Sequence, residues 1–455
     1  MATNYRHLTH KNDITVGLPN AAGNRDNARD SPARMARFTI VFLVAFSAMI
    51  AVAGAVLAGI YRVLAHHLGP EAAPWLRVVL SAVFVLAWVL IAVLVIILLL
   101  RKVLGFIQAR VGPTRSGPHG AFQTCADAFK LLVKEDVIPS GADKWVFTLA
   151  PLLVFVPAYM VYTVVPFGDG FVAGDLNIGL LYVAAITSIA VIGIVMAGRS
   201  SDNKYSLLGG MRSAAQMVSY EIPVVLSFLP LIVLTGSLNL NDVVRNQAGG
   251  FWNWHILAPF PLVIPGLIGF LVYLIGSLAE ISHTPFDLPE AESELVSGYN
   301  TEYSGMKFAF FFLAEFAASF TVCAIGTTLF LGGWNSGLPF LPSFGAWGLF
   351  WFMLKAWSMM FLLIWVRGTL PRVRVDQLME MGWKFLIPLQ LINFLIVAML
   401  VCLFGFRGMF APGRNRDEGR GMRDESGAGL GTRGAGLDSH PPSLVPHPLE
   451  SGGAP

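Results

Sequence analysis

Long apolar stretches without charge limit this chain more than any other feature. The chain is 55% hydrophobic and only 13% charged, whereas soluble domains carry about 25% charged residues. A helix needs roughly 20 apolar residues to cross about 30 Å of hydrocarbon, and open strands cannot satisfy their backbone in lipid. We therefore predict an all-α polytopic membrane protein with about nine spans, near 38–61, 78–100, 145–168, 176–198, 222–241, 257–279, 307–331, 347–366 and 385–406.

The two ends of the chain differ from this pattern. Residues 1–37 are polar and hold six Arg and Lys residues. The stretch 38–61 is too long and too late for a signal peptide, so we expect an uncleaved span there. Residues 411–455 are rich in Gly, Pro, Ser and Arg, a composition that cannot bury a core, so we predict a disordered tail.

Basic residues gather in loops that alternating helices would place on one side of the membrane. An excess of Lys and Arg marks the cytoplasmic side. We therefore predict a multi-pass protein of the cell inner (plasma) membrane, with a cytoplasmic N-terminus and an external C-terminus. The basic segments are 101–144, 199–212 and 367–384, whereas the loops predicted opposite, 167–177, 239–256 and 332–346, contain Arg245 as their one Lys or Arg.

Metal and nucleotide motifs are scarce. The three cysteines do not form a C-x-x-C pair, so neither a zinc site nor an iron–sulfur cluster is expected on this chain. The glycine-rich run 429–434 has neither a strand before it nor a helix after it, as a dinucleotide-binding turn requires. A net charge of +3 gives no reason to expect nucleic acid as a partner.

Two segments on the basic side carry most of the candidate chemistry. Within 121–134, apolar residues recur at helical spacing, which predicts a helix lying at the membrane interface; a plain stop-transfer charge cluster is the simpler alternative. The second segment, 280–302, is acidic and has no Lys or Arg, the nearest being Lys307. Either water screens these acids or some are held protonated. The six acids are Glu280, Asp287, Glu290, Glu292, Glu294 and Glu302.

Ionisable residues inside or at the edge of the spans form a third group. A charge in hydrocarbon costs roughly 3 kcal/mol or more, so such residues usually face water, a partner charge or a proton path. Hydrogen bonding between helices, or snorkelling at a helix end, is the alternative explanation. The members are Glu221, Glu280, Glu315 and Lys355.

Five motifs, in order along the chain, together resemble the H subunit (also called subunit 1) of respiratory complex I, the NADH-quinone oxidoreductase. The resemblance covers about residues 78–406 and implies an eight-helix core with structured cytoplasmic loops, to which 38–61 adds one span. The motifs are RKVLGFIQARVGP (101–113), FQTCADAFKLLVKED (122–136), SDNKYSLLGGMRSAAQMVSYE (201–221), TPFDLPEAESELVSGYNTEYSGMKFAFFFLAE (284–315) and LPRVRVDQLMEMGWK (370–384).

The resemblance implies a division of labour. Cytoplasmic loops would form a quinone chamber with peripheral subunits that hold FMN and the iron–sulfur clusters, and acids would lead from it toward small membrane subunits and antiporter-like subunits. Quinone would be the substrate, and this chain would hold no cofactor itself. The implied chamber or interface residues are Arg101, Gln108, Arg110, Arg212, Phe286, Asp287, Arg372 and Arg374. The implied proton path comprises Glu221, Glu280, Glu290, Glu292, Glu294, Glu302, Glu315 and Lys355.

Four positions depart from the family pattern, namely Leu100, Arg199, Ser282 and His283, which implies an altered chamber wall. Two other functions stay open from sequence. A membrane anchor of a related membrane-bound hydrogenase would share the fold and use another electron acceptor. A secondary transporter is disfavoured, because the chain has no internal repeat and its acids gather at one membrane face.

Overall fold

The computed structural model describes residues 31–68 and 73–404, except 111, 115, 118–119, 260, 289–295, 339 and 343–344. These residues all belong to one folding unit, Met1–Ala411. The predictions for most of the N-terminal extension, for the glycine-rich run 429–434 and for the disordered tail lie outside the described residues.

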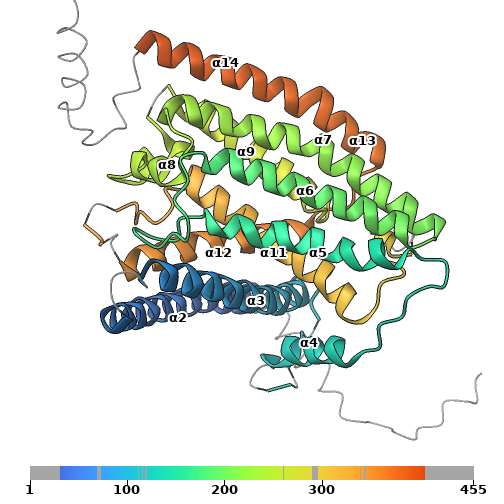
Figure 1. Cartoon of the computed structure of the whole chain (residues 1–455). Coiled ribbons are helices and arrows are strands. Elements are labelled where there is room, and N and C mark those ends of the chain that lie inside the picture. Colours follow the sequence, from blue (N-terminus) through green and yellow to red (C-terminus); the bar gives the residue numbers. More distant parts are fainter. Residues whose placement is uncertain are drawn as a thin grey trace, which may run out of the picture. The chain divides into compact units, whose positions relative to one another are not determined.

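Within the described residues, nine helices are long and apolar enough to cross a membrane, which confirms the predicted fold class. The helices run side by side as one bundle (Figure 1). They are α2 (Ser31–Leu68), α3 (Ala73–Ile107), α5 (Lys144–Met160), α6 (Gly179–Ser200), α7 (Lys204–Thr235), α9 (Val263–Glu280), α11 (Gly305–Phe330), α12 (Ala346–Thr369) and α14 (Ile387–Phe404).

Each predicted span corresponds to one of these helices, and α7 differs most from its prediction. The prediction placed a span at 222–241, but α7 begins at Lys204 and ends at Thr235. The N-terminal part of α7, residues 204–221, carries Lys204, Arg212 and Glu221, so a search for uncharged stretches excludes it. This part is nevertheless helical, and it packs on α6 through glycines: a Cβ on Gly198 would lie 3.2 Å from Gly210 Cα.

Short helices connect the long ones at the two ends of the bundle. At one end lie the basic segments with α4 and α13, and we call it the basic end; α8 lies at the opposite end (Figure 1). The predicted interface helix at 121–134 is present as α4. The short elements are α4 (Gln123–Val133), η2 (Val161–Thr163), α8 (Leu240–Asn246), η3 (Phe251–Asn253), η4 (His255–Leu257), η5 (Gly298–Asn300), α13 (Val375–Glu380) and the π-helical turn η6 (Met381–Leu386).

The additional helix α2 packs on α12 and α3 and joins the main core. Phe46 lies edge-on to Trp357 of α12, with ring centroids 5.0 Å apart, and it also contacts Trp88 of α3. Leu43 and Ile50, one turn to either side, are buried in the same cluster. Apolar side chains such as Val41, Val52 and Val56 remain exposed on α2, as expected for a lipid-facing surface.

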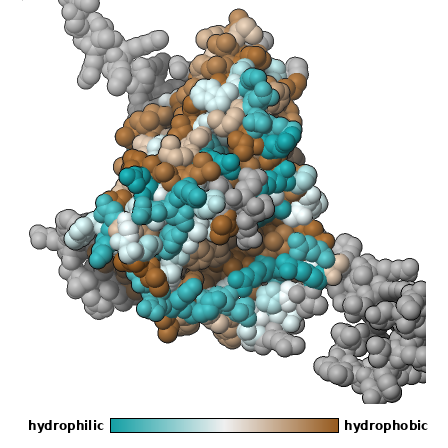
Figure 2. All heavy atoms as spheres, turned by 90° about the vertical axis from the view of Figure 1, so that its right-hand side faces the viewer, coloured by the Kyte–Doolittle hydropathy of each residue, from teal (hydrophilic) through white to brown (hydrophobic). Residues whose placement is uncertain are grey.

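Figure 2 looks at the basic end and shows hydrophilic residues gathered across this face between hydrophobic margins. The amphipathic helix α4 contributes to this end, with Phe129 and Val133 exposed and Asp127 bound to Arg101 of α3. Residues 281–288 and 296–302, the described parts of the acidic segment after α9, lie next to α7 and α11. Most of the described candidate residues therefore lie at or just beneath this face, whereas Lys355 lies toward the opposite end.

Candidate functional site

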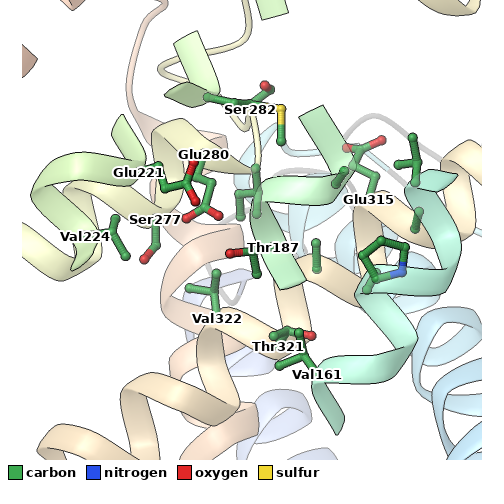
Figure 3. Close-up of a pocket in the computed structure, with 18 of the residues that line it drawn as sticks. Val161, Thr187, Glu221, Val224, Ser277, Glu280, Ser282, Glu315, Thr321 and Val322 are labelled. Atoms are coloured by element: carbon green, nitrogen blue, oxygen red, sulfur yellow. The ribbon is translucent and has the colours of Figure 1, made fainter. Parts of the chain in front are cut away.

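Glu221 of α7 and Glu280 of α9 lie together because a glycine lets their helices approach closely. A Cβ added at Gly276 would lie 2.7 Å from Val224 Cγ2, so the two helices are in close contact there. Gly276 and Glu280 are four residues apart, and Val224 and Glu221 are three apart, so each pair shares one helix face. The contact therefore brings the two carboxyl groups together. Figure 3 shows their side chains pointing toward one another.

Glu221 also has a polar partner on a third helix. The hydroxyl of Ser188 on α6 donates a hydrogen bond to its carboxylate. Two residues later, Pro223 lacks a backbone N–H, so the carbonyl of Ser219 loses its usual helical donor. The sequence thus makes α7 locally polar around Glu221, which lies near the middle of the helix.

Glu315 of α11 stands between two basic side chains. Its Oε1 lies 3.3 Å from Nε2 of His283 and 3.8 Å from NH1 of Arg367 near the end of α12. The hydroxyl of Ser319, one turn further along α11, is also 3.3 Å from His283 Nε2. The His283 side chain is only 3% exposed and that of Glu315 only 18%, so this arrangement is largely shielded from water.

The electrostatics around His283 follow from its burial. Burial lowers the pKa of His283 well below its usual value, and the positive charge of Arg367 lowers the pKa further. The negative charge of Asp287 acts in the opposite direction. The imidazole is therefore neutral near pH 7, and it can donate or accept a hydrogen bond through Nε2 depending on its tautomer.

A cavity of about 120 Å³ connects the three carboxyls. Side chains of α5, α6, α7, α9 and α11 line it, among them Glu221, Glu280 and Glu315 (Figure 3). Its remaining wall is mostly apolar, with hydroxyls of Thr187, Ser277 and Thr321 interspersed. Because a water molecule needs only about one probe sphere of space and a few polar partners, a cavity of this size and lining is able to hold several waters between the carboxyls.

The segment after α9 is held in place by hydrogen bonds to its backbone carbonyls. The Gln216 side-chain amide of α7 donates to the carbonyls of Ala279 and Phe286, both at 2.8 Å. The carbonyl of Pro285, which follows a cis peptide bond, accepts from the N–H of Val373 at 3.0 Å. Residues 281–288 therefore join α7 and α9 to the segment before α13.

The other predicted site residues lie apart from the cavity. Arg101 pairs with Asp127 at 2.6 Å, Gln108 and Arg110 are exposed after α3, and Arg372 and Arg374 are exposed before α13. Arg212 is partly buried on α7 and Phe286 packs against Tyr220. Glu290, Glu292 and Glu294 lie outside the described residues.

Two members of the predicted proton path are also separate from the three clustered carboxyls. Glu302 accepts a hydrogen bond from the Asn203 side chain at 2.7 Å and lines a different, polar pocket with Arg199 and Lys204. Lys355 donates to the carbonyls of Leu331 and Asn335, beyond the far end of α11. Neither residue lines the cavity of about 120 Å³.

The sequence does not predict that Arg367 and His283 are the neighbours of Glu315. The sequence shows Glu315 as the one acid of its predicted span and gives it no partner, yet α12 brings Arg367 to it. A signal for this was present, since Arg367 ends an apolar span at the basic end. His283 was noticed as a departure from the family pattern, but its contact with Glu315 depends on the turn after α9.

Among the residues that the structure describes, His, Cys, Asp and Glu side chains do not form a group able to hold a metal ion. The site is instead built from carboxyls, hydroxyls, one imidazole and one guanidinium. Carboxyls and an imidazole bind and release protons, whereas the guanidinium keeps its positive charge.

Comparisons with known proteins agree with this assembly. A model of the NADH dehydrogenase family matches residues 80–398. The chain belongs to the NADH dehydrogenase family. The H subunit of the NADH-quinone oxidoreductase of Dehalococcoides mccartyi (strain CBDB1) is 50% identical over 329 residues, which are 72% of this chain and 88% of that protein. The H subunit from Brevibacillus brevis is 50% identical over 326 residues, or 71% and 93% of the two chains. The H subunit from Bacillus thuringiensis (strain Al Hakam) is 53% identical over 307 residues, or 67% and 88%.

Membership of the NADH dehydrogenase family confirms the resemblance inferred from the five motifs. The match begins at residue 80, so the whole of α2 precedes the region that the family model matches. The relatives' names favour the quinone reductase interpretation over the hydrogenase anchor.

Proposed function

We propose that this chain is the H subunit, a membrane component, of a proton-translocating NADH:quinone oxidoreductase. Its basic end would lie on the cytoplasmic side of the plasma membrane and bind the peripheral subunits that carry FMN and iron–sulfur clusters. The loops there, with Arg101, Gln108, Arg110, Arg372 and Arg374, would form one wall of a quinone chamber. Small and antiporter-like membrane subunits would complete the complex.

The cavity shared by three carboxyls supports the proposal that this subunit takes part in proton translocation. Glu221, Glu280 and Glu315 reach one cavity of about 120 Å³ from three separate helices. Glu221 acts electrostatically on Glu280, and the cavity extends to Glu315. Coupled carboxyls titrate as a group, so a charge change near one redistributes protons among the others. Reduction of a quinone at the chamber changes the local charge, and residues 281–288 connect the chamber wall to the cavity.

The mechanism assigns distinct tasks to these groups. Asp287 and the segment 281–288 sense the charge and protonation of the reduced quinone. Glu315 takes up or releases a proton in response, and Glu280 and Glu221 carry the change across α9 and α7. Ser188 donates a hydrogen bond to Glu221 and holds its side chain in position.

The substitution Glu280→Gln tests this function in the purified complete complex reconstituted into proteoliposomes. Glutamine keeps the size and hydrogen bonding of the side chain but cannot carry a proton. Since removing a proton-transferring group commonly costs 10²-fold or more in rate, we expect protons pumped per NADH to fall below about a tenth of the wild-type value. NADH:quinone reductase activity with a short-chain quinone should remain measurable.

Asp242→Asn is the matched control, because Asp242 is an acid of α8 at the opposite end that accepts a hydrogen bond from Ser237. It should pump as the wild type does. Wild-type pumping by Glu280→Gln would rule out a proton path through this cavity.

A further inference from the structure

Glu315 and its two basic neighbours form an arrangement with more than one stable pairing. The NH1 group of Arg367 is 3.8 Å from Glu315 Oε1, which is too long for a hydrogen bond. That nitrogen is buried and has no hydrogen-bond partner among the described residues. A buried guanidinium donor without an acceptor is costly, so a small shift of the Glu315 carboxylate toward Arg367 would be favourable.

On its other side, the same carboxyl oxygen lies 3.3 Å from His283 Nε2. A neutral imidazole nitrogen can donate to an ionised carboxylate or accept from a protonated carboxyl, according to its tautomer. Arginine can only donate. The two neighbours therefore differ in what they offer: the positive charge of Arg367 favours the ionised carboxylate, whereas neutral His283 is also able to accept the proton of the protonated acid.

We propose that Glu315 changes partner as it gains and loses a proton, pairing with Arg367 when ionised and with His283 when protonated, so that the charge on His283 controls this exchange. His283 is thus a positioning residue for Glu315. The inference rests on the proposed function, since it concerns the proton path of the same cavity. It adds a pH-sensitive control that depends on one residue of the turn after α9.

Charged and titratable groups surround His283 on several sides. Glu315 faces it from α11 and Arg367 from α12, while Asp287 lies on its own segment. Glu280 of α9 also reaches the cavity, where Glu221 of α7 is the charge that acts on it. Burial and the charge of Arg367 together keep His283 neutral at pH 7, which is the state that the exchange requires.

Acidification should then interrupt the exchange. Once His283 binds a proton, both ring nitrogens are donors, so it no longer accepts from protonated Glu315. Glu315 is then held ionised between two cations and cannot cycle. We therefore expect protons pumped per NADH to decline as the pH is lowered, a decline that we call the acid limb.

The experiment is a pH profile of pumping per NADH for the complete complex in proteoliposomes. The variant His283→Gln keeps a donor and an acceptor but does not titrate. Its number of protons pumped per NADH should therefore stay within about twofold across the pH range in which the number for the wild type falls roughly tenfold per pH unit. His255→Gln is the matched control, since His255 is equally buried but lies at the opposite end of the bundle; it should keep the acid limb.

Asp287→Asn provides a second measurement if His283→Gln does not assemble. Removal of the Asp287 charge lowers the pKa of His283 further, so the acid limb should move to lower pH. An acid limb that persists in His283→Gln, is missing from the wild type, or is unmoved in Asp287→Asn would overturn the proposal. These outcomes are separate from the Glu280→Gln test, because normal pumping by that variant rejects the proton path whatever the shape of the pH profile.

Discussion

Lys355 offers a sharp test of how partners decide the role of a membrane charge. Its Nζ donates to the carbonyls of Leu331 and Asn335 at 2.7 and 2.6 Å and lies 4.5 Å from the ring centroid of Trp254. Leu331 is sixteen residues beyond Glu315 on α11, so Lys355 is bonded about 24 Å from that carboxyl at 1.5 Å per residue. We infer that Lys355 caps the end of α11 rather than relays protons.

The variant Lys355→Met measures this cap. Two hydrogen bonds to a charged donor contribute about 1.5–3 kcal/mol each, and the cation–π contact about 1 kcal/mol. Against these gains, burying the cation costs several kcal/mol, which the substitution removes. Because the two carbonyls are left without this donor, we expect a net destabilisation of about 2–4 kcal/mol.

Thermal denaturation of the purified complex provides the assay, with pumping per NADH measured on the same preparations at a permissive temperature. Lys384→Met is the matched control: the side chain of this lysine is 75% exposed and is bonded to Glu380, four residues earlier, a pair worth at most about 0.5 kcal/mol. Lys355→Met should melt several degrees lower and still pump. Equal melting of the two variants would refute the cap, and loss of pumping without loss of stability would return Lys355 to the proton path.

Two further predictions concern packing and pH. Gly209→Ala should destabilise the protein by about 1–3 kcal/mol, because its Cβ would lie 2.7 Å from Gly298 Cα and displace η5. In the same thermal denaturation assay, the control Gly59→Ala, whose Cβ faces open space, should melt at the wild-type temperature or slightly above it. Burial lowers the pKa of His255 to about 4, below its unfolded value of about 6.5. The folded state therefore binds fewer protons, and up to about 3 kcal/mol of stability, complete above pH 6.5, is lost as the pH falls toward 4. Melting curves between about pH 6.5 and 4 should show that the stability of His255→Gln depends less on pH than that of the wild type. An identical pH dependence of the two proteins would contradict the burial argument.

The fold was largely predictable because the membrane imposes a simple rule on sequence. Apolar stretches of about 20 residues, two of them interrupted by Glu315 or Lys355, located the nine long helices of the described residues, and helical spacing located α4. The rule failed over residues 204–221 of α7, where Arg212 and Glu221 interrupt the apolar run. One face of this part packs on protein, as the close contact of Gly209 with Gly298 shows, so a criterion based on lipid alone does not describe it.

The site was only partly predictable because sequence shows which residues are ionisable but not what they contact. Glu221, Glu280 and Glu315 were singled out as charges in or at the edge of spans, and they line one cavity; their part in a proton path stays a prediction. Lys355, singled out on the same ground, and Glu302, singled out as part of the acidic segment, lie elsewhere. The partners of Glu315 come from the turn after α9 and from the end of α12, and neither position carries a motif that links it to α11.

Depth in the membrane is therefore a poor guide to the role of a charged residue here, and the chemistry of its partner is a better one. Lys355 and His255 bind backbone carbonyls at the end of α11, and a carbonyl does not titrate, so these contacts persist whatever happens at the chamber. Glu280 faces another carboxyl and Glu315 faces an imidazole, so the stability of each contact depends on where a proton resides. Only the second kind of contact is able to couple a charge change at a quinone to proton movement, which is why the candidate path is confined to the cavity beneath the basic end.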